Sequence, residues 1–294
     1  MTHLKLEEIK VSTKTIIAIA NISIDINKLY DFLPVEKYIL IKKKRGRKKK
    51  IQVNDPNADI KEGSIILMKY QDKYKGILLK KPKKTARKKK YFRNALTIVM
   101  ILKNSDNTNK LINFKISKNG KFQITGCKNI LHAHCVIKYM WDLIKDTVDL
   151  YELKDPSFKV VFNTVMTNID FNLGFLINRE NLDKYINRNT DYNSLLETSF
   201  GYTGVNIKIP FELDKDKIKL SQLVYKENKW VKSLIEPGDY INKKKPKYYN
   251  TFLVFHSGNI IMSGMRKEFM KDSFEFFLKI IDECKDYIKE KLDI

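Results

Sequence analysis

The stretch Thr251-Phe-Leu-Val-Phe-His-Ser-Gly-Asn-Ile-Ile-Met-Ser-Gly-Met-Arg266 decides how the whole chain is interpreted. Its first residues alternate with the period of a β-strand, and Ser257-Gly258 is a turn dipeptide. Residues 259–262 supply a return strand, which Ser263-Gly264 ends. The stretch therefore predicts a β-hairpin. Apolar residues at helical spacing between 267 and 292 predict a long helix directly after it.

The same plan occurs earlier in the chain. Leu111-Ile-Asn-Phe-Lys-Ile-Ser-Lys-Asn-Gly-Lys-Phe-Gln-Ile-Thr-Gly-Cys-Lys128 predicts a second hairpin, and residues 129–148 predict the helix that follows it. Each half then reads as strand, short helix, strand, hairpin and long helix. Self-similarity of this kind indicates a repeated structural unit. We expect a first repeat in residues 1–150 and a second in residues 151–294.

The remaining segments fit this repeat. Residues 40–92 predict a basic insertion, because lysine-rich blocks at 42–50 and 80–90 border it. A linker is expected at residues 151–156, and a long charged connection at 213–248. The other predicted elements are strands at 11–26, 94–102, 158–175 and 203–209, short helices at 27–33 (ended by Pro34) and 178–187, and a small hairpin within 64–79.

The charge of the chain points to a polyanionic partner. The 294 residues carry a formal net charge of +23, and 43% of them are hydrophobic, which is enough for a sizeable core. Nucleic acid is the simplest partner for such an excess. Only seven of the 57 basic residues are arginines. Lysine binds phosphates as a mobile point charge more than it reads bases, so phosphate contacts are expected to dominate.

Cysteine, histidine and apolar patterns limit the other possibilities. Three cysteines argue against a disulfide framework, and no signal peptide or membrane-length apolar run is found, so an intracellular protein without membrane contact is expected. Cys127, His132, His134 and Cys135 lack the spacing of a four-ligand zinc site. No nucleophile triad, nucleotide loop or paired carboxylates occur. We therefore predict no metal, no cofactor and no enzymatic activity.

Both hairpins resemble those of the TATA-box-binding-protein family. The motif of that family is apolar-apolar-Phe-Ser-Ser-Gly-Lys-apolar-apolar-x-Thr-Gly-Ala-Lys, and residues 253–266 and 119–128 are similar to it in the right order. Phe158-Lys-Val, at the start of the second repeat, also matches. The sequences of residues 11–15 and 166–175 are more similar to the divergent members of this family from large DNA viruses. The resemblance covers most of the chain outside residues 40–92 and part of 211–247.

The resemblance implies a fold and a function. The fold is α+β: two pseudo-symmetric repeats form a curved antiparallel saddle with helices on its convex face. The concave face lies in a widened minor groove of AT-rich duplex DNA, where phenylalanine wedges kink base steps. The partners would be a transcription factor B-like protein and the RNA polymerase machinery, at a promoter. The expected location is the nucleus, or a cytoplasmic viral factory or virion.

The resemblance also assigns site residues. Phe255 and Tyr202, with Phe200 close by, fall at wedge positions of the second repeat, where the first repeat has Ser117 and Ala95. Symmetric bending is therefore in doubt, because neither Ser nor Ala can unstack a base step. The other expected DNA contacts are Thr125 and Ser263 at the Thr-Gly positions, Asn168 (with Asn21 or Thr15 as its counterpart), Ile261 in the groove, and Lys128 and Arg266 near phosphates.

Two other functions remain open. A protein of this fold could bind DNA or another protein without bending DNA or preferring TATA, as the missing wedges of the first repeat suggest. Related saddle domains also precede the catalytic parts of some ribonucleases H and DNA glycosylases. Such an enzyme needs a further catalytic domain, and the two repeats already occupy the chain.

Overall fold

The computed structural model describes residues 4–40, 55–79, 94–197, 203–214, 217–241 and 247–290. Contacts divide the chain into two compact units, and the boundaries fall inside two strands. The N-terminal unit comprises Ile16–Asn163 and Leu220–Ile235. The C-terminal unit comprises Met1–Thr15, Thr164–Lys219 and Glu236–Ile294. No helix among the described residues is long and apolar enough to cross a membrane.

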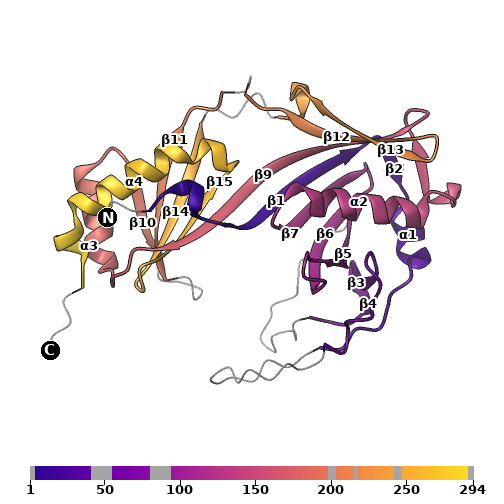
Figure 1. The fold of residues 1–294 in the computed structure, drawn as a ribbon, viewed down its shortest axis with the longest axis horizontal. Helices are drawn as coiled ribbons and strands as arrows, with labels where there is room; N and C mark the ends of the chain where they lie inside the picture. Colours follow the sequence, from indigo (N-terminus) through magenta and orange to yellow (C-terminus); the bar gives the residue numbers. More distant parts are fainter. Residues whose placement is uncertain are drawn as a thin grey trace. The chain divides into compact units, whose positions relative to one another are not determined.

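The strands of the N-terminal unit form an antiparallel sheet in the order β3-β5-β6-β7-β1 (Figure 1). Helix α2 packs on one face of this sheet, and its buried residues, such as Met140 and Trp141, belong to the main core of the unit. The elements are β1 (Val11–Ala20), β2 (Ile22–Ile24), α1 (Ile26–Phe32), β3 (Ile65–Tyr70), β4 (Lys73–Gly76), β5 (Ala95–Lys103), β6 (Asn109–Ser117), β7 (Lys121–Cys127), α2 (Ile130–Ile144), β8 (Tyr151–Leu153), β12 (Leu220–Lys226) and β13 (Lys229–Ile235).

The C-terminal unit has the equivalent order β10-β11-β14-β15-β9. Helix α4 covers one face of its sheet: Phe277 stacks on Phe252 with ring centroids 4.2 Å apart, and Phe274 meets Phe171 edge to face. The elements are β9 (Phe158–Asn172), α3 (Arg179–Asn189), β10 (Asn193–Glu197), β11 (Gly204–Phe211), β14 (Tyr248–Phe255), β15 (Asn259–Gly264), α4 (Lys271–Glu283) and α5 (Lys285–Ile288).

Most of the expected elements are confirmed. Both hairpins, both short helices and the strand at 94–102 lie within a few residues of their predicted positions. The expected α+β class, with antiparallel strands and a repeated order of elements, is confirmed as well. The short helices begin where Asp25 and Asn178 accept hydrogen bonds from backbone N–H groups, which is the usual role of these residues as N-caps. Pro34 follows the end of α1, as predicted.

Three local predictions were wrong. The connection at 213–248 contains the hairpin β12–β13, whose turn residues Glu227 and Asn228 both have positive φ (51° and 60°). Two such residues are the mark of a tight hairpin turn, a signal that the charged composition obscured. The helix expected over 267–292 is divided into α4 and α5 at Cys284. The expected linker after residue 150 contains β8, which pairs with β2.

Part of the expected basic insertion belongs to the sheet. Strand β3 pairs with β5, and Leu67 and Val99 are buried together on the face opposite α2. Partly buried residues cover them, among them Tyr38 and Leu78. The side chain of Asn57, 1% exposed, bonds both backbone groups of Ile39 and fastens this cover. The lysine blocks at 42–50 and 80–90 lie outside the described residues.

Candidate nucleic-acid interface

Among the described residues, no helix covers the second face of the sheet of the C-terminal unit. Along β14, Phe252 and Val254 are buried against α4, so Thr251, Leu253 and Phe255 lie on the other face. The same alternation places every second residue of β9, β10, β11 and β15 on that face. We call it the open face of the C-terminal unit.

Strand register arranges the open face into two rows that cross five strands. The residues of each row lie directly opposite one another on neighbouring strands, where side chains are in contact distance. The apolar row runs Leu195, Asn206, Leu253, Ile261 and Asp170. The hydroxyl row runs Asn193, Lys208, Thr251, Ser263 and Asn168.

Four of the site residues expected from the sequence therefore share one face. Ile261 lies in the apolar row between Leu253 and Asp170, and Ser263 lies beside Asn168 in the hydroxyl row. Phe255 is on the same face, beyond the apolar row, opposite Gly204. Phe200 and Tyr202 lie outside the described residues, so their assigned roles stay predictions.

Sequence reasoning missed several residues of this face. Leu253, Thr251 and Asn206 were not singled out, although strand alternation counted back from Phe255 would have found the first two. The Oδ1 atoms of Asn168 and Asn206 are buried and have no hydrogen-bond partner among the described residues. An unmet buried polar group is unfavourable by about 1–3 kcal/mol. Because these atoms are acceptors, a bound ligand would remove that penalty only by donating a hydrogen bond to them.

One residue of the open face is poorly suited to contact with DNA. Asp170 is exposed at the end of the apolar row, beside Ile261. A carboxylate there repels phosphates and offers only acceptors to a groove that is itself lined with acceptors. Lys208, in the adjacent row, is the cation of the described part of this face.

The N-terminal unit has a corresponding open face with different chemistry. Gly120 and Gly258 occupy the same turn position, with φ of 72° and 76°. Counting from these turns, Ser117 takes the place of Phe255, and Lys115 takes the place of Leu253. The row equivalent to the apolar row is Lys69, Thr97, Lys115, Gln123, with Ile17 completing it by position.

The turns also settle which residue corresponds to Asn168. The carbonyl of Gly120 accepts a hydrogen bond from Ala20 N–H (2.9 Å), as that of Gly258 does from Leu173 N–H (3.0 Å). Five residues before each of these donors stand Thr15 and Asn168, so Thr15 is the counterpart. Asn21 is engaged elsewhere: its amide donates to Ser157 O (2.8 Å) and accepts from Lys159 N–H (2.7 Å). These bonds hold the start of β9.

Register changes the correspondence at the second wedge position as well. Ala95 lies opposite Ser117, and Gly204 lies opposite Phe255. Gly204 is therefore the counterpart of Ala95, whereas the family motif had paired Ala95 with Tyr202. In the first repeat neither residue of the pair is aromatic.

The remaining predicted contacts have mixed surroundings. The Thr125 hydroxyl, on the open face of the N-terminal unit, donates to Asn113 O (3.0 Å). Lys128 is exposed just beyond β7. The guanidinium of Arg266 donates to Lys219 O (3.1 Å), and burial lowers its pKa from the ordinary value. DNA contact by each of these residues stays a prediction.

The side chains of the cysteine and histidine cluster lie in different surroundings. No group of three or more metal-ligating side chains is found among the described residues. His134 is buried and bonded to Ser221 Oγ (3.1 Å), while the Nδ1 of His132 accepts from the backbone N–H of Lys128 (3.2 Å). Burial raises the pKa of the Cys127 thiol to about 12, which disfavours the thiolate that a metal needs.

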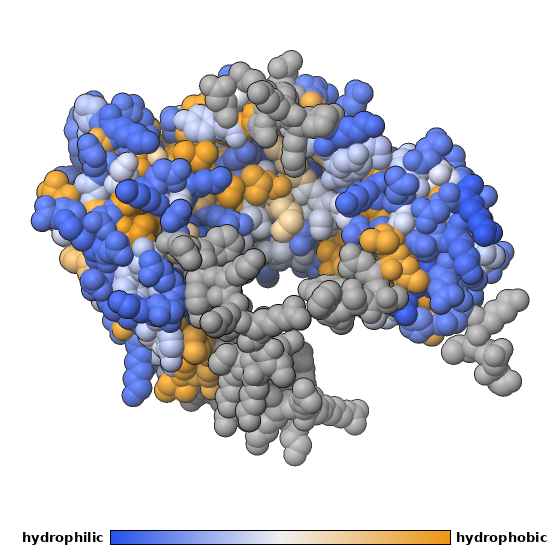
Figure 2. All heavy atoms as spheres, turned by 180° about the vertical axis from the view of Figure 1, so that it is seen from behind, coloured by the Kyte–Doolittle hydropathy of each residue, from blue (hydrophilic) through white to orange (hydrophobic). Residues whose placement is uncertain are grey.

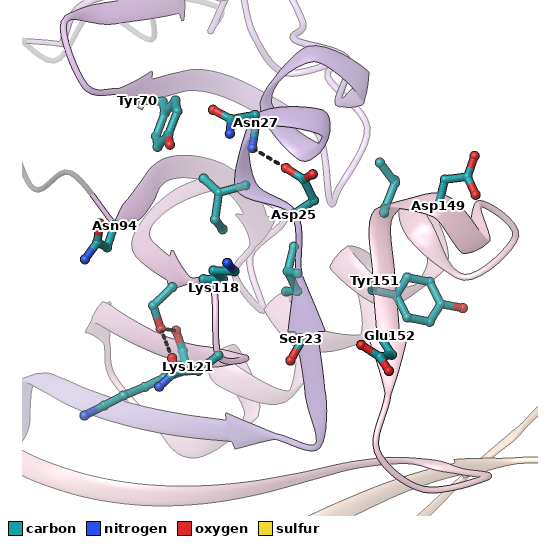
Figure 3. A pocket seen from close by; sticks show the side chains of 15 residues that line it. Ser23, Asp25, Asn27, Tyr70, Asn94, Lys118, Lys121, Asp149, Tyr151 and Glu152 are labelled. Carbon is teal, nitrogen blue, oxygen red and sulfur yellow. Dashed lines mark hydrogen bonds between the residues drawn. The ribbon is translucent and has the colours of Figure 1, made fainter.

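A pocket in the N-terminal unit lies between the β6–β7 turn and the start of β8 (Figure 3). Lys118 and Lys121 line it together with Asp149 and Glu152. Asp25, also in its wall, is engaged in capping α1 (Figure 3). Charges of both signs define no ligand class, so this pocket does not extend the candidate interface.

Figure 2 shows that hydrophilic residues dominate the visible surface, with hydrophobic groups between them.

Comparison with known proteins gives two viral relatives. No family model matches the chain. The chain is 26% identical over 226 residues to the uncharacterized protein 335L of Invertebrate iridescent virus 6, a match that covers 71% of this chain. It is 25% identical over 243 residues to a TATA-box-binding protein-like protein of Acanthamoeba polyphaga mimivirus, covering 73% of this chain. The chain spans 66% of the length of each relative.

Among solved structures, Methanococcus jannaschii TBP is similar, with a TM-score of 0.46 and 14% identity over 94% of this chain and 99% of that one. The similarity to the viral proteins is a similarity of sequence. The repeated strand order was observed independently, in the structure of this chain. The chain is therefore similar to a viral protein named TATA-box-binding protein-like, in agreement with the resemblance of its two hairpin motifs to that family.

Proposed function

We propose that the chain binds AT-rich duplex DNA in the minor groove through the open faces of its two units. The observation that carries this proposal is the hydroxyl row, with Thr251, Ser263 and Asn168 side by side next to the apolar row. The minor groove of A·T pairs offers acceptors and no exocyclic amino group. Hydroxyl and amide donors flanked by apolar side chains suit such a surface, and they discriminate against the G·C amino group.

Bending is proposed to be concentrated at the C-terminal unit. Phe255 is on its open face, and an aromatic side chain that enters a base step unstacks it. The equivalent position in the N-terminal unit is Ser117, which is too small to do so. The net charge of +23 supports a long-range, salt-dependent attraction to phosphates. Lys128 and Arg266 are proposed to lie near the backbone.

The biological role follows from this binding mode and from the viral relative named TATA-box-binding protein-like. We propose a promoter-recognition factor that acts by binding rather than by catalysis. It would assemble a transcription factor B-like protein and RNA polymerase on DNA, in the nucleus or in a cytoplasmic viral factory or virion. A form that binds DNA without bending it is the second candidate, favoured by the Ser117–Ala95 pair in the first repeat.

Gel-shift titration with a TATA duplex and a GC duplex of equal length tests the function. Tighter binding to the TATA duplex, by about tenfold or more, is expected from groove readout and duplex deformability. Equal affinity for both duplexes, with only a dependence on salt, would sink the sequence preference. Energy transfer between labels at the two duplex ends then separates the two candidates, because only the first shortens the end-to-end distance.

A further inference from the structure

The hairpin β12–β13 has an outer strand with an unpaired edge. Strand β12 pairs on one side with the first part of β9 and on the other with β13. Among the described residues, β13 pairs with β12 alone. Figure 1 shows the two strands side by side in orange. An edge of this kind presents backbone donors and acceptors to another chain.

The register of the hairpin identifies which groups are presented. Lys226 and Lys229 flank the two-residue turn, so they exchange backbone hydrogen bonds, and such pairs recur at every second residue. Val231 and Ser233 therefore direct their N–H and C=O groups toward β12. The backbone groups of Trp230, Lys232 and Leu234 point outward. By the same alternation, Ser221, Leu223 and Tyr225 direct their backbone groups away from β13, toward β9, with which β12 pairs.

The outward residues carry side chains on the same face of the hairpin. Trp230 packs on that face against Tyr225 and Phe158, with ring centroids 5.0 and 6.0 Å apart. These contacts hold the strand firmly in place. Leu234, further along, is 65% exposed. An added strand would therefore place successive same-face side chains beside an aromatic residue, a lysine and an exposed leucine.

The charge of this edge selects its occupant. Lys138, Lys229 and Lys232 have no carboxylate within ion-pair distance in the described part of the chain, and Lys138 lies over the Trp230 ring at 6.0 Å. Pairing of β13 with a second copy of itself, centred on residue 232, would set Lys232 against Lys232, which is unfavourable. A strand with a carboxylate at that place would gain an ion pair instead.

We propose that the outer edge of β13 binds an extended acidic segment of a partner protein as an added β-strand. The segment carries apolar residues opposite Trp230 and Leu234 and a carboxylate opposite Lys232. Peptide N–H and C=O groups match the alternating groups of the edge at strand spacing. A nucleic acid backbone offers acceptors alone and cannot pair in this way, so the peptide is the occupant that fits. Within the N-terminal unit, Trp230 lies beside Phe158 and under Lys138 of α2, so this surface is on the side of α2 and not on the open face of that unit.

Fluorescence anisotropy with a labelled peptide tests the proposal. The probe is Thr-Val-Thr-Glu-Thr-Val-Thr, and its Glu→Lys version is the comparison. Saturable binding with a Kd of about 10–100 μM is expected for the first, and binding at least about tenfold weaker for the second, because the lysine would face Lys232. No saturable binding of the Glu peptide, or equal binding of both peptides, would overturn the proposal.

Two charge variants provide a matched pair. Lys232→Glu should weaken binding of the Glu peptide about tenfold, whereas Lys229→Glu, on the opposite face of the same strand, should change it less than about twofold. Equal losses in both variants would mean diffuse attraction rather than strand addition. Full competition by a GC duplex at equal phosphate concentration would indicate nucleic acid as the occupant and likewise contradict the proposal.

A proline variant tests the backbone pairing. Leu234→Pro removes an outward N–H without removing a bond to β12, so it should weaken peptide binding about tenfold while the hairpin persists. Hydrogen exchange checks both points: the amides of Lys232 and Trp230 should gain protection on peptide binding, and those of Val231 and Ser233 should be protected with or without peptide. Unchanged exchange at residue 232 on saturation would refute strand addition.

Discussion

Phe255 lies directly opposite Gly204 on the neighbouring strand, and this pair differs from its counterpart in the first repeat, where Ser117 faces Ala95. A Cβ atom on residue 204 would come within 2.8 Å of Leu253 Cδ1. The glycine thus leaves room for the two large apolar side chains of the open face, Phe255 and Leu253. In the N-terminal unit, Ser117 and Lys115 occupy the equivalent positions. There the residue equivalent to Gly204 is Ala95, whose Cβ is accommodated.

Replacing Phe255 by alanine is expected to reduce DNA bending more than DNA binding. The side chain is the wedge in the proposed mode, whereas encounter depends on charge, which the substitution does not alter. End-to-end energy transfer in a labelled TATA duplex measures the bend. Phe276→Ala, which removes an exposed ring from α4, is the matched control and should leave the bend unchanged. The same bend in Phe255→Ala and the parent protein would count against the wedge.

Replacing Gly204 by alanine is expected to disturb the open face. Because the new Cβ meets Leu253, the leucine must change rotamer, and we expect a loss of about 1–2 kcal/mol of unfolding free energy. Urea denaturation measures this loss. Ala95→Gly at the equivalent position serves as control and should cost no more than about 1 kcal/mol, through backbone entropy. A stabilised Gly204→Ala protein would show that the site has space to spare.

Replacing Ser263 by alanine is expected to lower the preference for A·T pairs. The hydroxyl lies in the hydroxyl row between Thr251 and Asn168, and loss of one hydrogen bond to a groove acceptor is worth about 1 kcal/mol, or roughly fivefold in affinity. Competition titrations with TATA and GC duplexes give the ratio directly. The GC affinity is the internal control and should stay constant. Equal weakening on both duplexes would place the hydroxyl outside the readout.

Replacing Asp170 by asparagine is expected to tighten DNA binding about two- to fivefold at low salt, because it removes a negative charge from the open face. The gain should shrink as salt increases, since screening weakens the repulsion that the carboxylate exerts. Asp272→Asn removes an equal charge from α4, on the covered side of the same sheet, and should have a smaller effect. If both variants bind alike, only net charge matters, and the open face has no special role.

His134 is expected to make the stability of the protein depend on pH. Burial, together with Lys232 and Lys138, lowers its pKa from 6.5 to about 4. Between these values the unfolded chain binds a proton that the folded protein does not, so stability is complete above pH 6.5 and falls as the pH decreases toward 4. Linkage gives a loss of about 3 kcal/mol at most for a shift of this size.

Urea denaturation between pH 7 and 4 measures this effect against His134→Gln, which keeps a hydrogen-bonding side chain near Ser221. The variant should be less stable at pH 7 and should lose less stability on acidification, since carboxylate titration is common to both proteins. Parallel pH profiles would mean that folding does not lower the pKa of His134.

The amino-acid sequence by itself determined the repeated plan and the elements with strong local signals. Alternation along 251–255, the turn glycines Gly120 and Gly258, and the apolar spacing of α2 are local patterns that carry their own structure. Tertiary structure decided the rest. Pairing register alone shows that Ser263 meets Asn168, that Gly204 faces Phe255, and that Thr15 rather than Asn21 corresponds to Asn168.

The reason is physical. A strand reveals which residues share a face, because its side chains alternate, but not which strand will lie beside it or at what offset. Those offsets are fixed by distant contacts, such as the backbone hydrogen bond from Leu173 N–H to Gly258 O. The hairpin β12–β13 was missed for a similar reason: its lysine-rich residues form a strand because β9 offers an edge, and its Trp230 packs on Tyr225 and Phe158.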